Sequence, residues 1–139
     1  MDTFDFRERG TSGVDEETER LASVVIGAAI EVHKELGPGL PENSYHQALS
    51  HELDLCGIPH ENESPVPVFY KVKTVGQGWI DILVCGRLMV ELKAVEALTA
   101  VHRAQVVTYL KVTGLQLGLL INFNVERLKD GIKRVINTK

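Results

Sequence analysis

The chain has 139 residues, of which 44% are hydrophobic and 24% charged, so it can form one domain and lacks the composition of a disordered protein. Its formal net charge of −4 does not by itself indicate a nucleic-acid binder. Its two cysteines, Cys56 and Cys85, form no CxxC pair, which argues against a disulfide framework or a zinc site.

The charge is unevenly distributed along the chain. Residues 1–20 hold seven acids and three bases, whereas the segment from Arg87 onward holds nine bases and four acids. The C-terminal half is therefore basic enough to contact phosphate groups, although such charges also occur on ordinary solvent-exposed faces. We predict a flexible acidic arm over residues 1–16 and a single domain over 17–139. The first 20 residues lack an apolar signal segment, and no apolar run approaches the length of a membrane span, so we expect a soluble, cytoplasmic protein.

Two helices are predicted first. Apolar residues recur at helical spacing from Glu16 to Leu36, and Gly37-Pro38-Gly39 should end that helix. The second helix should begin near Pro41 and end at Gly57.

The spacing of apolar residues then changes to that of strands, with one further helix. We predict strands at Val66–Tyr70, Trp79–Val84, Leu88–Lys93, Leu117–Phe123 and Leu128–Ile136, turns at Gly76-Gln77-Gly78 and Cys85-Gly86-Arg87, and a helix at Ala100–Thr113 between Thr99 and Gly114. The order α-α-β-β-β-α-β-(β), with a helical crossover to a buried strand, predicts an α/β fold with a mixed sheet covered by helices.

Three ionisable residues fall on the predicted hairpin. Glu91 and Lys93 are two apart on one strand and share a face, while Leu92 points into the core. Asp81 on the preceding strand should lie opposite them, within a shift of one or two residues. Two carboxylates so placed suit a hard divalent cation, Mg²⁺ or Mn²⁺, which would activate water, while Lys93 would offset charge developing on a phosphate.

Other residues are candidates for the same site. Gln105 and Tyr109 are four apart on one helix face and could contact the substrate backbone or support Lys93. Glu42 stands at a helix N-terminus, where its charge is also favoured without any metal. We assign substrate positioning to Tyr45, His102 and Lys111, with a purely structural role for His102 as the alternative.

Together these motifs resemble a known group of proteins. Asp81, Glu91-Leu92-Lys93 and Gln105-x-x-x-Tyr109 resemble the RecB-type branch of the PD-(D/E)xK nuclease superfamily. The segment from Gly39 to Tyr45 is similar to the signature of the GxxExxY family within it.

The resemblance implies a restriction-endonuclease-like core with Asp81 and Glu91 as metal ligands and Lys93 as a catalytic residue. It further implies Glu42 and the backbone carbonyl of Leu92 as additional ligands, and nucleic acid as the partner. A homodimer or a separate protein that selects the target is left open.

Three alternatives stand beside a nuclease. Asp81 and Glu91 could form a simple surface ion network with Lys93 or Arg87. The domain could instead be a non-catalytic nucleic-acid-binding or regulatory module, or it could hydrolyse a small nucleotide or phosphodiester.

Overall fold

The structure is a computed structural model that describes residues 13–138, and its elements follow the predicted order. Two helices come first, α2 (Glu16–Leu36) and α3 (Glu42–Leu55). The next elements are β1 (His60–Tyr70), β2 (Lys73–Val84) and β3 (Leu88–Lys93). The chain ends with α4 (Ala100–Thr113), β4 (Leu117–Asn122), the 3-10 turn η2 (Leu128–Gly131) and β5 (Ile132–Ile136).

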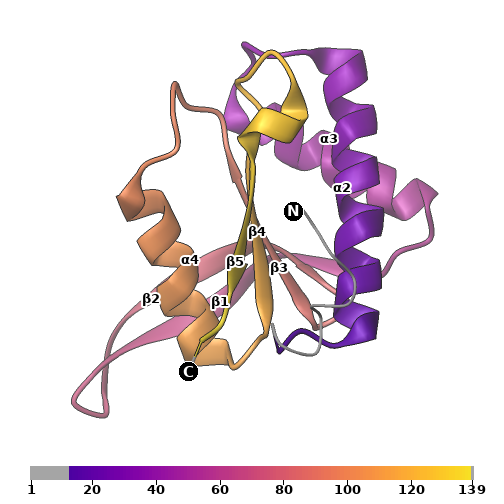
Figure 1. The fold of residues 1–139 in the computed structure, drawn as a ribbon. Helices are drawn as coiled ribbons and strands as arrows, with labels where there is room; N and C mark the ends of the chain where they lie inside the picture. Colours follow the sequence, from indigo (N-terminus) through magenta and orange to yellow (C-terminus); the bar gives the residue numbers. More distant parts are fainter. Residues whose placement is uncertain (1–12, 139) are drawn as a thin grey trace.

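The strands described form one sheet in the order β1-β2-β3-β4-β5. Neighbouring strands are antiparallel except β3 and β4, which are parallel because α4 crosses over between them. Helices α2 and α3 cover one face of the sheet and α4 covers the other (Figure 1). This confirms the mixed α/β architecture predicted from the sequence.

Each face of the sheet has its own apolar cluster. Leu88, Val90 and Leu92 of β3 pack with α2 and α3, whereas Met89 packs with α4. Because side chains alternate along a strand, Glu91 and Lys93 belong to the α4 face. No helix within residues 13–138 combines the length and apolar character needed to cross a membrane.

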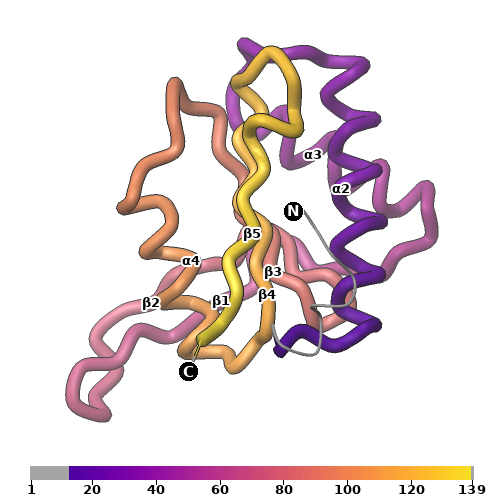
Figure 2. Tube along the Cα trace, viewed as in Figure 1, coloured from indigo at the N-terminus to yellow at the C-terminus, as the bar shows by residue number. Residues whose placement is uncertain are grey.

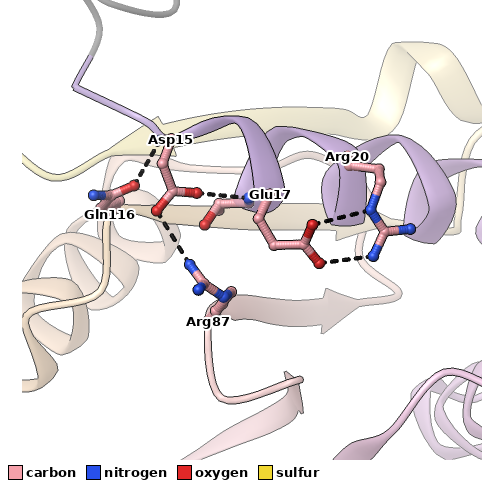
Figure 3. A network of polar contacts seen from close by, with 6 residues as sticks. Asp15, Glu17, Arg20, Arg87 and Gln116 are labelled. Atoms are coloured by element: carbon pink, nitrogen blue, oxygen red, sulfur yellow. Dashed lines mark hydrogen bonds and ion pairs between the residues drawn. The ribbon is translucent and has the colours of Figure 1, made fainter.

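The start of the folded part lies earlier than the predicted boundary at residue 17. Val14 is buried in the cluster beneath α2. The Asp15 side chain caps α2 by accepting a hydrogen bond from the Thr18 amide at 2.7 Å, and it pairs with Arg87 at 3.1 Å (Figure 3). Residues 1–12, which make up most of the predicted flexible arm, lie outside the described residues.

The hairpin of β1 and β2 is longer than the sequence indicated. Its turn lies at Lys71 and Val72 rather than at Gly76-Gln77-Gly78, which is part of β2. Both turn residues have positive φ, 48° and 62°, a conformation normally signalled by Gly or Asn. The hairpin extends past α4 to a tip away from the body (Figure 2).

The end of the chain also differs from its prediction. A strand was expected from Leu128, but η2 occupies residues 128–131 and the strand begins at Ile132. Gly131 lies directly against the backbone oxygen of Asn122, so no side chain fits there. This close approach ends the turn and starts β5.

Candidate metal centre

β2 and β3 separate at Asp81. Their last paired residues are Ile82 and Val90. Ile80 packs in the cluster beneath α4, whereas Ile82 packs in the cluster beneath α2 and α3, although residues two apart in an even strand share a face. The strand therefore rotates at Asp81, and a gap opens in the sheet between β2 and the end of β3.

Asp81 and Glu91 meet in this gap. The Asp81 amide donates a hydrogen bond to Glu91 Oε1 at 3.0 Å, and Asp81 Oδ2 accepts one from the Leu92 amide at 2.8 Å. These side-chain bonds replace the ladder that ends one residue earlier. Because the N–H and C=O of a residue in a strand point to the same side, the Leu92 carbonyl also points towards the gap.

Both carboxyl groups are held in a poorly hydrated place. Glu91 is only 3% exposed, and its burial, reinforced by the nearby charge of Asp81, raises its pKa to about 8. Burial likewise raises the pKa of Asp81, opposed by the hydrogen bond from the Leu92 amide. Ionising both groups is costly in this protein unless a cation is present.

The neighbouring cations do not neutralise this pair by contact. Within residues 13–138, no ion pair of 4.0 Å or less joins Lys93 to either carboxylate. Arg87, the other predicted partner, instead lies beside Asp15 at the start of α2 (Figure 3). The surface ion network considered from the sequence is therefore not formed.

The ends of α3 and α4 bring three more side chains near the gap. Partial desolvation raises the pKa of Glu42, and the charge of Asp81 adds to the rise, while Lys93 and His102 oppose it. His102 Nδ1 accepts a hydrogen bond from the Thr99 amide at 3.0 Å, so this ring also caps α4. His46, one turn after Glu42, acts electrostatically on both Glu42 and Asp81.

His46 was not predicted, and a chain of hydrogen-bonded polar groups fixes its ring. The carbonyl of Ile58 can only accept, so His60 donates to it through Nδ1 at 2.8 Å, and His60 Nε2 is hydrogen-bonded to Ser50 Oγ at 2.8 Å. Ser50 then accepts from Asn62 Nδ2 at 3.0 Å. Asn62 Oδ1 is left to accept from His46 Nε2 at 3.0 Å. No sequence motif marks this network, because its members come from two elements.

The remaining predicted site residues differ in their burial and in their contacts. Tyr109 is buried with its ring against Gly78, and Gln105 is exposed on the same helix. Lys111 is exposed in the last turn of α4. Tyr45 is 0% exposed, and its hydroxyl donates to the Gly37 carbonyl at 2.6 Å and accepts from an amide at 3.0 Å. Tyr45 therefore holds the loop after α2, and its role in substrate positioning stays a prediction.

The residues in the gap fit a hard divalent cation. Asp81 and Glu91 each accept one backbone hydrogen bond and have a second oxygen without a donor among the described residues. Among residues 13–138, no group of three or more His, Cys, Asp or Glu side chains is already arranged to hold a metal ion, and a ligand role for Glu42 stays a prediction. Mg²⁺ accepts this arrangement because it is commonly held by one or two carboxylates and keeps several waters.

Comparison with known families agrees with this geometry. The model of the PD-(D/E)XK nuclease superfamily matches residues 19–135, which include β2, β3 and α4. The chain belongs to this superfamily. No curated protein and no solved structure matched the chain.

Proposed function

We propose that this protein is a Mg²⁺- or Mn²⁺-dependent nuclease that hydrolyses phosphodiester bonds of nucleic acid at Asp81, Glu91 and Lys93. The observation that carries the proposal is the pair of buried carboxylates at the point where β2 leaves β3. Their desolvation would be offset by a divalent cation, and their second oxygens are available to it. Membership of the superfamily supports the same reaction.

The proposed centre consists of two side chains and one backbone group. Asp81 and Glu91 would hold the cation together with the carbonyl of Leu92. When bound, the cation supplies Lewis-acid chemistry, polarising the phosphodiester and activating water. Glu42 acts from the rim, within electrostatic reach of Asp81.

Lys93 is the proposed cationic catalyst. It shares the α4 face with Glu91 and acts electrostatically on Asp81, Glu91 and Glu42. Lys93 forms no ion pair among the described residues. Its ammonium group can therefore orient the attacking water and offset charge on the pentacovalent phosphate. Gln105, Tyr109 and His102 of α4, with Lys111, are proposed to position the substrate strand.

The finer classification also belongs to this proposal. Gly39-x-x-Glu42-x-x-Tyr45 and Gln105-x-x-x-Tyr109 support placement in the GxxExxY family and the RecB-type branch. In the structure the first motif joins a buried tyrosine that holds the loop to a glutamate near Asp81.

The test is hydrolysis of labelled single- and double-stranded DNA and RNA with Mg²⁺ or Mn²⁺. We expect Asp81→Ala and Lys93→Ala each to lower kcat/KM by at least about 100-fold. The matched controls are Asp54→Ala on α3 and Lys34→Ala on α2, both at exposed positions, which should retain wild-type activity. Equal activity of wild type, Asp81→Ala and Lys93→Ala would contradict the proposal.

Calorimetric titration with Mn²⁺ separates the alternatives. Binding that Asp81→Ala abolishes supports the metal centre. Absence of binding favours a non-catalytic module, and cleavage of small phosphodiesters but of no polymer favours a nucleotide hydrolase.

A further inference from the structure

The exposed apolar side chains of the described residues gather on one projecting element. Six of the twelve large apolar side chains that are exposed lie in the β1–β2 hairpin: Val68, Phe69, Tyr70, Val72, Val75 and Trp79. The hairpin extends beyond the body past α4 (Figure 1). Large exposed apolar groups concentrated in one place mark a contact surface rather than ordinary surface variation.

Two of the three exposed aromatic residues, Phe69 and Trp79, share a face of this hairpin. Pro65, Pro67 and Phe69 alternate along β1 and so point to one side, and Trp79 of β2 pairs with Pro65. Phe69 and Trp79 therefore lie on the same face, about 13 Å apart along the strands. Val66, which alternates with Pro65 and Pro67, is buried in the cluster beneath α4, so the face of Phe69 and Trp79 is the one turned away from α4. Trp79 is two residues before Asp81 in β2.

The outer part of the hairpin and the helix beside it carry no negatively charged side chain. Residues 65–80 contain Lys71 and Lys73 and no Asp or Glu. Residues 97–125, which include α4, contain Arg103 and Lys111 and again no Asp or Glu. These two segments touch, since Tyr109 of α4 packs on Gly78 of β2.

The opposite layer has the reverse character. Helices α2 and α3 together carry eight acids and two bases. The net charge of −4 thus hides an uneven distribution of charge: α2 and α3 are acidic, whereas α4 and the outer part of the hairpin contain no carboxylate, and Glu61 and Glu63 lie at the base of the hairpin.

We propose that the outer part of the β1–β2 hairpin, residues 65–80, binds a single-stranded nucleic acid, with Phe69 and Trp79 stacking on bases and Lys71 and Lys73 contacting phosphates. Stacking needs unpaired bases, whose faces are buried in a duplex. The inference rests on the proposed function in that the bound strand would reach Asp81, but binding is measured without cleavage.

A second copy of the chain is the less suitable occupant. A two-fold contact between hairpins would bring the lysines of both copies together, and residues 65–80 offer no carboxylate to neutralise them. A polyanion neutralises the same lysines and leaves the aromatic rings available for stacking.

The test measures binding by fluorescence anisotropy in EDTA, using labelled oligothymidine and oligouridine of about 20 nucleotides and a matched duplex. Wild type should bind at least one single strand more tightly than the duplex. Phe69→Ala/Trp79→Ala should weaken that binding about tenfold or more without changing its salt dependence. Lys71→Ala/Lys73→Ala should weaken it and reduce the slope of log K against log salt by about 1.4.

Matched substitutions on the acidic layer serve as controls. Lys34→Ala on α2 and Leu55→Ala on α3, where Leu55 is 68% exposed, should bind within about twofold of wild type. Thermal unfolding of every variant checks that the hairpin changes leave the body folded.

Several outcomes would overturn the inference. These are unchanged affinity of both hairpin variants, tighter binding of the duplex, retention on anionic vesicles in place of oligonucleotides, or a hairpin-dependent dimer in sedimentation with no effect on oligonucleotide affinity. Hairpin-dependent binding without cleavage under any condition would remove only the proposed nuclease activity. Cleavage with wild-type kcat/KM in the hairpin variants would remove only the binding surface.

Discussion

The hydroxyl group of Tyr109 lies where a side chain on Gly78 would begin, so α4 and β2 are in close contact at this pair. All three atoms nearest to an added Cβ at Gly78 belong to the Tyr109 ring or its hydroxyl. Tyr109 is itself buried in the cluster beneath α4. The contact ties the hairpin to the helix close to Asp81.

Gly78→Ala is therefore expected to destabilise the protein by about 1–3 kcal/mol, because the new methyl group displaces Tyr109 from a packed cluster. Gly76→Ala is the control, since a Cβ there would meet only Val68 at 4.0 Å. Chemical denaturation measures both. Adding Tyr109→Phe to Gly78→Ala should recover part of the loss, and equal stability of the two alanine variants would show that the contact carries no strain.

The pKa of Glu91 predicts how stability depends on pH without metal. This pKa is raised to about 8 in the folded protein from a usual 4.5, so between these values the folded protein holds a proton that the unfolded chain has lost. Stability should then decline as pH rises from about 4.5 to about 8. Glu91→Gln should remove most of the decline and raise Tm at pH 8 by about 4 °C or more in EDTA.

At pH 8, a bound metal ion should reverse the order of the Tm values of wild type and Glu91→Gln. Mn²⁺ should raise the Tm of wild type and leave that of Glu91→Gln unchanged, since binding to the folded state alone stabilises it. Glu35→Gln on the exposed side of α2 is the control and should follow wild type. A wild-type Tm that stays flat across this pH range in EDTA, or rises, would argue against the buried pair.

Tyr45→Phe should lower the stability of the protein while leaving its activity nearly unchanged. The variant loses the hydroxyl that joins the Gly37 carbonyl to the Leu40 amide, at an expected cost of about 1–3 kcal/mol. Its Mn²⁺ affinity and its kcat should stay within about twofold of wild type. Tyr70→Phe, at an exposed position, should leave Tm unchanged. A large drop in kcat for a folded Tyr45→Phe would instead support the predicted role of this residue in substrate positioning.

Asn122 should prove important for the segment between Lys93 and α4. Its side chain accepts from the Val95 amide at 3.0 Å and donates to the Val95 carbonyl at 2.9 Å. Asn122→Ala leaves the Val95 amide without a partner and the Val95 carbonyl with only the 3.4 Å bond from Asn124, and it should cost about 2–3 kcal/mol. It should also lower kcat, because this segment follows Lys93 directly. Asn124→Ala, which loses only a 3.4 Å bond to the same carbonyl, should be nearly neutral in thermal unfolding and nuclease assays.

The helices were the most predictable part of the fold. The boundaries of α2 and α4 agree with their prediction because Asp15 and Thr99 cap them and Gly37 and Gly114 end them. The meeting of Asp81 and Glu91 was predictable for a similar reason, since the short connection at Gly86 fixed the register of the hairpin.

The features that were missed depend on contacts between distant residues. The turn at Lys71 and Val72 has no glycine, and the glycine that suggested a turn, Gly78, instead makes room for Tyr109. The network that orients His46 and the bonds of Asn122 to Val95 join separate elements. Neither has a local signature, because each partner is an ordinary polar residue in its own segment.

The two prolines of β1 have a consequence for the behaviour of the protein at high concentration. β1 is an edge of the sheet, and an edge with free amides promotes pairing with another chain. Pro65 and Pro67 have no amide hydrogen, and the ladder is irregular beyond Val68. The β1–β2 hairpin can thus display aromatic side chains to solvent while resisting growth into aggregates of stacked strands. Replacing both prolines should make the protein more prone to form fibrils.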